Sequence, residues 1–148
     1  MYTKKKDQHM PIKKPLTLTK AKKKAWEAFS RYIRLRDCLR TTGTTTHGRC
    51  ITCQKVYEFK QLHAGHFIPG RNGNNLFDER GVHAQCGVCN LWKKGDWANY
   101  LDSMKELYGQ EIIDELLEQR HEIKKYTVSE LLEKEKTYKE KYEQTNNQ

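Results

Sequence analysis

The chain has 148 residues, of which 36% are hydrophobic and 32% are charged, and its formal net charge is +9. This length suits one domain with a small core, and no run of about 18 apolar residues is present, so the composition argues against two domains and against a membrane-spanning helix. Residues 1–24 carry a charge of +8 whereas residues 101–148 carry −4, which favours nucleic acid as a partner of the first part of the chain. Taken alone, the lysine tail is equally compatible with a role in solubility only.

Residues 1–17 are predicted to be a disordered basic arm. They contain five lysines and two prolines but no hydrophobic period. They also have no apolar centre that could serve as a secretion signal, so we expect a cytoplasmic protein. The lysine run lacks an adjoining apolar helix face, which argues against a membrane surface as its partner.

A helix is predicted from about Thr19. Its apolar residues recur at a spacing of three to four, which favours a stripe facing the core over a surface for base stacking. The stripe consists of Trp26, Phe29, Tyr32, Ile33 and either Leu35 or Arg36. Basic residues on and beside this helix could contact DNA phosphates: Lys22, Lys23, Lys24, Arg31, Arg34 and Arg40.

The centre of the chain changes to short segments separated by turns. Residues 41–48 are predicted to be a loop, and two strands are predicted at about residues 62–68 and 81–85. Between these strands, residues 69–75 contain proline, glycine and asparagine and should form a positively charged surface loop. Further helices are predicted from Asp96, as a cap, to about Tyr108, from Gln110 to about Lys125, and from a capping box at Thr127 and Glu130. The last helix is charged nearly all round, so it is either a solvated end or half of a dimer contact.

Four of the five cysteines form two CxxC pairs, Cys50 with Cys53 and Cys86 with Cys89, separated by 32 residues. Each pair places two sulfurs on a tight turn at the separation that a tetrahedral ion requires, so we predict one structural zinc ion. A disulfide is disfavoured in a reducing cytoplasm, and a thioredoxin-like site would need one CxxC at a helix start. Four thiolates leave no coordination position open, so this ion should hold the fold without contacting substrate. Cys38 is expected to be a small buried side chain.

Two polar residues lie where this ion would bring them together. His66 is near the end of the first predicted strand, and Asn90 directly follows Cys89. Taken alone, the residues favour a histidine that braces the zinc knuckle and leave open that Asn90 caps a helix. His9, His47 and His121 have no partners in the sequence and are expected on the surface.

With these residues the sequence resembles the HNH, or ββα-metal, nucleases, and more closely the phage NinG/Rap family of recombination endonucleases. The matching segments are AGHF at residues 64–67, LFDERGVHAQCGVCN at residues 76–90, the lysines before Gly95, Tyr100, the turn at residues 107–111 and the helix start at residues 127–130. The resemblance covers residues 25–143. Its short nuclease motif is only moderately specific, whereas the motif together with the helical tail is considerably more so.

The resemblance implies an α+β fold with an N-terminal helix, a zinc-stapled ββα-metal core at residues 50–95 and helices at residues 96–144, all in one domain of residues 18–148. It implies that His66 is the general base, since a neutral imidazole can take a proton from the attacking water. Asn90 would bind a catalytic Mg2+ or Mn2+ ion through its amide oxygen. Lys93, Lys94 and Arg71 would hold neighbouring phosphates.

Two positions depart from the general HNH pattern. Gly81 stands where many members have the middle asparagine, and we expect the turn to survive because glycine and asparagine both tolerate positive φ. Gly65 stands where many have aspartate or histidine before the base, so a second ligand of the catalytic ion must come from elsewhere. His63 and His83 are the candidates. His83 on its short strand could point into the site as a catalytic residue, or it could pack against the first helix.

The resemblance further implies branched DNA, such as Holliday junctions, as substrate, a phage protein acting in the bacterial host, and a twofold dimer with the last helices as its interface. Two other classes remain open. One is a non-catalytic zinc protein that binds DNA, and the other is a protein interaction module that uses the C-terminal helices.

Overall fold

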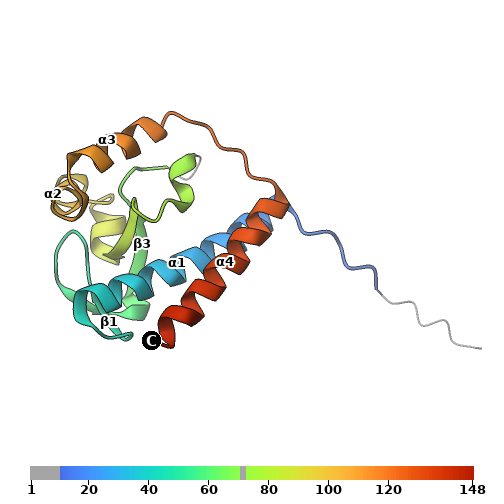
Figure 1. Cartoon of the computed structure of the whole chain (residues 1–148), viewed down its shortest axis with the longest axis horizontal. Coiled ribbons are helices and arrows are strands. Elements are labelled where there is room, and N and C mark those ends of the chain that lie inside the picture. Colours follow the sequence, from blue (N-terminus) through green and yellow to red (C-terminus); the bar gives the residue numbers. More distant parts are fainter. Residues whose placement is uncertain (1–10, 71–72) are drawn as a thin grey trace, which may run out of the picture.

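Helices and short strands form a mixed α+β fold, which a computed structural model describes for residues 11–70 and 73–148 (Figure 1). Its α-helices are α1 (Leu18–Thr42), α2 (Trp97–Tyr108), α3 (Gln110–Gln119) and α4 (Val128–Asn146). Its strands are β1 (His47–Arg49), β2 (Val56–Glu58), β3 (Leu62–His66) and β4 (Val82–Cys86). Residues 11–17 form no helix or strand, and the rest of the predicted arm lies outside the described residues. Within the described part, no helix is long and apolar enough to cross a membrane.

The helix α1 has a polar start and a glycine end. The side chain of Thr17 accepts a hydrogen bond from the backbone N–H of Lys20 at 3.3 Å, and Gly43 ends the helix with a φ of 73°. Phe29 and Ile33 of the predicted stripe are fully buried. The prediction that this stripe faces the core is therefore confirmed.

The last helix, α4, packs along α1 and runs in the same direction (Figure 1). Leu131 and Tyr138 are buried, and the ring of Tyr138 meets Phe29 edge-on with centroids 4.7 Å apart. The capping box of Thr127 and Glu130 is present as predicted. The alternative of a solvated end is wrong, because Leu131 and Tyr138 are buried in the core against α1 and Arg31 of α1 stacks on the ring of Tyr142.

Two antiparallel hairpins lie beside α1. In the second hairpin β3 pairs with β4, so that Ala64 lies opposite Ala84 and His66 opposite Val82. This confirms both predicted strands to within two residues. The first hairpin, β1 with β2, was missed, since residues 41–48 were assigned to a loop. Strands of three residues are too short to show an alternating pattern.

A buried ion pair joins α1 to β4. The carboxylate of Asp37 accepts hydrogen bonds from Arg36 Nε at 2.8 Å and from the backbone N–H of Ala84 at 2.7 Å. Arg36 in turn donates to the carbonyl oxygens of Glu79 and Val82. Burial alone would raise the pKa of Asp37, but the neighbouring guanidinium of Arg36 holds that pKa below its usual value. The hairpin is thus fixed on α1 by charge as well as by apolar contact.

The helices α2 and α3 cover the other side of the hairpin and differ from the prediction at their ends. Asp96 precedes α2, but its φ is 45° and its carboxylate accepts from the side chain of Asn99 instead of capping the backbone. Helix α3 ends at Gln119 and not near Lys125. The chain then extends through residues 120–127 because it must reach α1, where α4 docks (Figure 1).

Candidate functional site

The four CxxC cysteines converge on one point. Cys50 and Cys53 come from the turn between β1 and β2, while Cys86 ends β4 and Cys89 follows it. Their sulfurs all lie within 4.8 Å of one another, and those of Cys53 and Cys86 are 4.0 Å apart. Zinc bonds of about 2.3 Å in a tetrahedron place sulfurs roughly 3.8 Å apart, so this donor set fits a structural zinc ion.

The fifth cysteine, Cys38, stays outside this cluster, as predicted. It is fully buried on α1 beside Leu62 and Ala84. Burial raises the pKa of its thiol to about 11, which keeps the group protonated and unreactive. Among the cluster thiols, burial is outweighed at Cys86 by hydrogen bonds, first from the backbone N–H of Cys89, which lower its pKa to about 7.

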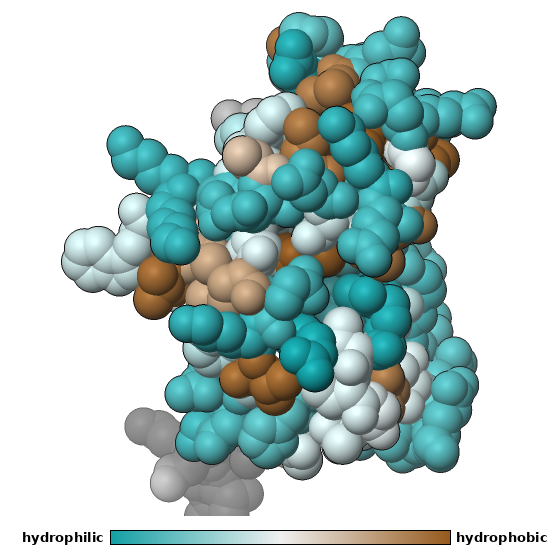
Figure 2. Space-filling model, turned by 90° about the vertical axis from the view of Figure 1, so that its left-hand side faces the viewer, coloured by the Kyte–Doolittle hydropathy of each residue, from teal (hydrophilic) through white to brown (hydrophobic). Residues whose placement is uncertain are grey.

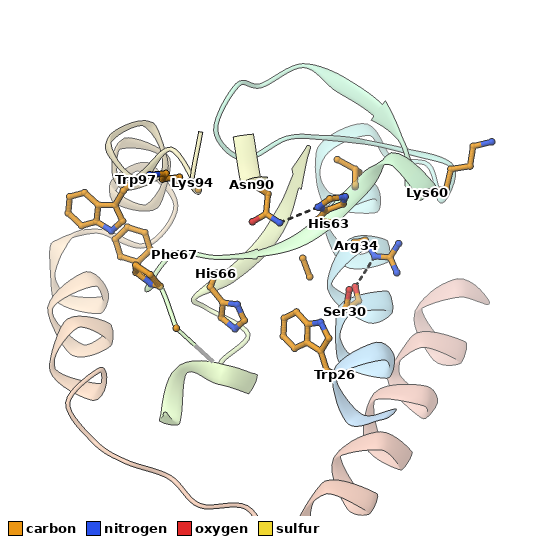
Figure 3. Close-up of a pocket in the computed structure, with 15 residues that line it drawn as sticks. Trp26, Ser30, Arg34, Lys60, His63, His66, Phe67, Asn90, Lys94 and Trp97 are labelled. Atoms are coloured by element: carbon orange, nitrogen blue, oxygen red, sulfur yellow. Dashed lines mark hydrogen bonds between the residues drawn. The ribbon is translucent and has the colours of Figure 1, made fainter. Parts of the chain in front are cut away.

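Asn90 directly follows Cys89 on a short π-helical turn, Val88–Trp92, which also contains that cysteine. Gly87 precedes this turn, so the alternative that Asn90 caps a helix is wrong. Its side-chain nitrogen lies 3.2 Å from Nδ1 of His63, to which the amide can donate (Figure 3). In that arrangement the amide oxygen of Asn90 is turned away from His63. Turns of this π type are frequent at functional sites.

His66 is held by contacts on its ring edge and its ring face. Its Nε2 lies 3.1 Å from the carbonyl oxygen of Leu76, and Trp26 of α1 stacks on the ring with centroids 5.0 Å apart. A carbonyl oxygen can only accept, so Nε2 carries the proton of this hydrogen bond. In the neutral imidazole the lone pair therefore lies on Nδ1.

His66, His63 and Asn90 line one cavity of about 710 Å³. Figure 3 shows His66 and Asn90 reaching the same space from different elements, with Trp26 beside the imidazole. The two residues singled out in the sequence are therefore brought together, along with one of the two candidate second ligands.

The described lining of this cavity includes three basic side chains and no acidic one. Arg34 of α1 is stacked over the ring of Phe59, and its Nε donates to the carbonyl oxygen of Ser30 at 3.2 Å. Lys60 and Lys94 complete the basic lining. The sequence predicts Lys94 as a phosphate contact and offers Arg34 as one of several such contacts. It does not predict Lys60, because nothing near Lys60 in the sequence links it to His66 or to the CxxC pairs. The arrangement favours an anionic ligand.

The remaining predicted DNA contacts are spread over the surface. Lys22 and Lys23 line a hollow next to Trp26, whereas Lys24 faces α4. Lys93 is exposed on the same segment as Lys94. Arg71 lies outside the described residues, as does His9, while His47 and His121 are exposed as predicted.

His83 does not reach this cavity, which corrects its prediction as a catalytic residue and metal ligand. It is 1% exposed and lies against α2, where Nδ1 is 3.2 Å from the hydroxyl of Tyr100 and Nε2 is 2.8 Å from that of Tyr108. Tyr100 donates its proton to the carbonyl oxygen of Gly65 at 2.7 Å, so it must accept from His83. Tyr108 then donates to His83.

This chain of hydrogen bonds braces β3 immediately before His66. It requires a neutral His83, and burial lowers the pKa of His83 to about 3. The residue is therefore a buried structural histidine. His83 lies opposite Gly65 in the hairpin, and its ring is held on the α2 side by the hydroxyls of Tyr100 and Tyr108.

The two glycines that depart from the HNH pattern have different structural roles. A Cβ atom at Gly65 would lie 2.1 Å from Oε1 of Gln85, so that side chain already fills the space beside the strand. At Gly81 a Cβ would meet nothing closer than Leu116 at 3.5 Å. Its φ is not positive, so the expected reason for glycine there is wrong.

Comparison with known proteins places these residues in a family. A family model described as bacteriophage lambda NinG protein matches residues 2–148. A protein described as "Protein ninG" from Escherichia phage 933W is 34% identical over 123 residues, which cover 82% of this chain and 54% of that protein. Those of Escherichia phage lambda and Salmonella phage P22 are each 32% identical over 123 residues, or 82% of this chain and 53% and 54% of their own lengths. The chain thus spans about half the length of these relatives, and no solved structure matches it.

Proposed function

The chain belongs to the NinG family of phage proteins, and for this member we propose a metal-dependent endonuclease that hydrolyses phosphodiester bonds in branched DNA. The observation that carries the proposal is the meeting of His66 and Asn90 in one cavity whose charged lining is basic. An imidazole and an amide oxygen beside an anion site are the groups that an HNH-type hydrolysis needs.

In this proposal His66 is the general base. Its Nε2–H is directed to the carbonyl oxygen of Leu76, so Nδ1 is the nitrogen that would take a proton from the attacking water. Stacking on Trp26 fixes the plane of the ring, so the base does not have to be oriented at the moment of reaction.

A catalytic divalent ion would be held by Asn90 through its amide oxygen, with His63 as the second protein ligand. The amide nitrogen of Asn90 lies 3.2 Å from Nδ1 of His63, so a half-turn of the amide group would bring its oxygen beside that nitrogen, whereas His83 is buried against α2. When bound, such an ion would stabilise the negative charge of the transition state and of the leaving oxygen. The described lining supplies no carboxylate, so phosphate and water oxygens must complete the coordination.

Basic side chains would place the substrate. Arg34, Lys60 and Lys94 border the cavity, so they can contact the scissile phosphate or its neighbours, and Lys22 and Lys23 continue the basic surface past Trp26. The four thiolates would hold a structural zinc ion that ties the Asn90 turn to the first hairpin. Resolution of a four-way junction needs two symmetric cuts, so we expect a twofold dimer.

The test is incubation of the purified full chain with labelled four-way-junction DNA and with linear duplex, each with Mg2+, with Mn2+ or with a chelator of the divalent ion. We expect cuts in the junction only when the divalent ion is present. Binding without any cut, with either ion, would contradict the proposal and favour a zinc-containing DNA-binding protein. The absence of carboxylates from the described cavity lining also supports that alternative.

A further inference from the structure

The turn that carries Asn90 exposes an apolar surface on its outer side. Trp92 is 84% exposed, Leu91 63% and Val88 53%, although Cys89 between them is buried. Figure 2 views the molecule from the side of α2 and shows apolar side chains reaching that face in small, separate groups among hydrophilic ones. An indole ring left almost wholly in water contributes little to folding and offers its flat face to a ligand.

We propose that Trp92 stacks on the exposed face of a base at the branch point of a DNA substrate and so determines the preference of this protein for branched over linear DNA. This inference rests on the proposed function in that it takes DNA to be the substrate. Aromatic rings on a basic surface are the usual platform for unpaired bases, because every base offers a flat π face. In an intact duplex this face is covered by the neighbouring base pair, whereas the base pairs that end the arms at an open branch point expose it.

Charge and size favour a nucleobase over a protein partner. Lys93 and Lys94 directly follow Trp92, and both are exposed, so a phosphate backbone can lie beside the ring. Between Glu79 and Asp96 the chain contains no acidic residue. The surface that three side chains on one turn expose is also far smaller than the roughly 800 Å² that each partner contributes to a stable protein interface. One indole ring, in contrast, is large enough to cover one base.

The position of Trp92 relative to the cavity sets where the cut should fall. Asn90 turns toward the cavity and Trp92, two residues later, lies on the outer side of the same turn. A base stacked on Trp92 would therefore lie close to the proposed cleavage site, on the other side of one short turn.

The experiment measures binding of the full chain to a four-way junction and to a duplex of equal length, in Ca2+, so that affinity is read without cleavage. Trp92→Ala should weaken junction binding roughly tenfold or more and change duplex binding less than about twofold, because a stacked base contributes that much to affinity. Trp92→Phe should keep most of the preference. The matched control is Ile123→Ala, which removes an equally exposed apolar side chain on the segment before α4.

Equal losses on junction and duplex would overturn the proposal, as would an unchanged junction affinity. A shift of Trp92→Ala from dimer to monomer in sedimentation, without a selective loss of junction binding, would assign the surface to a second copy of the chain and also overturn it. The binding assay needs no cleavage. If the wild-type chain failed to cut DNA, that failure would count against the nuclease proposal, and the binding assay would still test the role of Trp92.

Discussion

At the scale of single residues, Gly65 shows how the strand before His66 is fitted to its surroundings. The side chain of Gln85 occupies the space where a Cβ at residue 65 would lie, and its Nε2 donates to the carbonyl oxygen of Gly95 at 2.8 Å. A residue with a side chain at position 65 must displace this amide. The ligand that many HNH sequences carry there therefore cannot be accommodated without rebuilding the turn after Asn90.

We predict that Gly65→Ala lowers the free energy of unfolding by about 1–3 kcal/mol through overpacking. Gly81→Ala is the matched control and should change it by less than about 0.5 kcal/mol, since a methyl group there has room. Denaturant unfolding of both variants measures this. In a Gln85→Ala background the cost of Gly65→Ala should shrink, and an unchanged cost would refute the steric explanation.

The lowered pKa of His83 implies that the stability of the fold depends on pH. Its pKa is lowered to about 3 in the folded chain, whereas an unfolded histidine titrates near 6.5. Between these values the unfolded chain binds a proton that the folded chain does not. The contribution of neutral His83 is therefore complete above about pH 6.5 and is lost progressively as the pH falls, by up to about 1.4 kcal/mol per pH unit.

His83→Gln should consequently be less stable at pH 7 but should lose less stability than the wild type between about pH 6.5 and pH 4. His47→Gln changes an exposed histidine and serves as the control, with a wild-type slope. Unfolding free energies across this range provide the measurement. Parallel slopes for the wild type and His83→Gln would show that His83 is protonated in the folded chain.

At the scale of elements, the contact between α1 and β4 depends on Asp37. Asp37→Ala would leave the guanidinium of Arg36 without its carboxylate and the N–H of Ala84 without its acceptor. We predict a loss of about 3–5 kcal/mol in the free energy of unfolding. Asp102→Ala, on the exposed side of α2, should cost less than about 0.5 kcal/mol. A comparable small loss for both would mean that apolar packing alone holds the hairpin on α1.

Elements with a strong local signal could be predicted from the sequence. The stripe of α1, the capping box of α4 and the alternation in β3 and β4 all depend on neighbours within a few residues. The first hairpin could not be predicted, because its strands are three residues long. The docking of α4 could not be predicted either, because the few apolar residues of this charged helix form a contact surface only when α1 lies beside them.

The residues of the candidate site also differ in how far the local sequence predicts them. CxxC spacing predicted the cysteine cluster, and the residue after the last cysteine led to Asn90. Lys60 and Trp97 line the cavity because of the tertiary fold, so no local pattern pointed to them. The alternation of a strand left two faces open for His83, and only the position of Tyr100 and Tyr108 on α2 decides between them.

At the scale of the whole molecule, the cysteine cluster joins segments that are far apart in the sequence. We predict one zinc ion per chain in purified material, and we expect Cys53→Ser to lose it and to unfold at a markedly lower denaturant concentration. Cys38→Ala removes the fifth, buried cysteine and should keep the zinc at a modest cost in stability. Metal analysis of both variants tests this, and loss of zinc from Cys38→Ala would refute the proposed ligand set.

The proposed function depends on the imidazole of His66, which should activate water for cleavage of DNA bound across the cavity. It is tested most directly by the initial rate at which wild type and His66→Ala cut a labelled four-way junction in Mn2+, at equal zinc content and equal DNA binding. We expect His66→Ala to cut at least about 100-fold more slowly, because removal of a general base costs about that much. Cleavage by His66→Ala at the wild-type rate would contradict it.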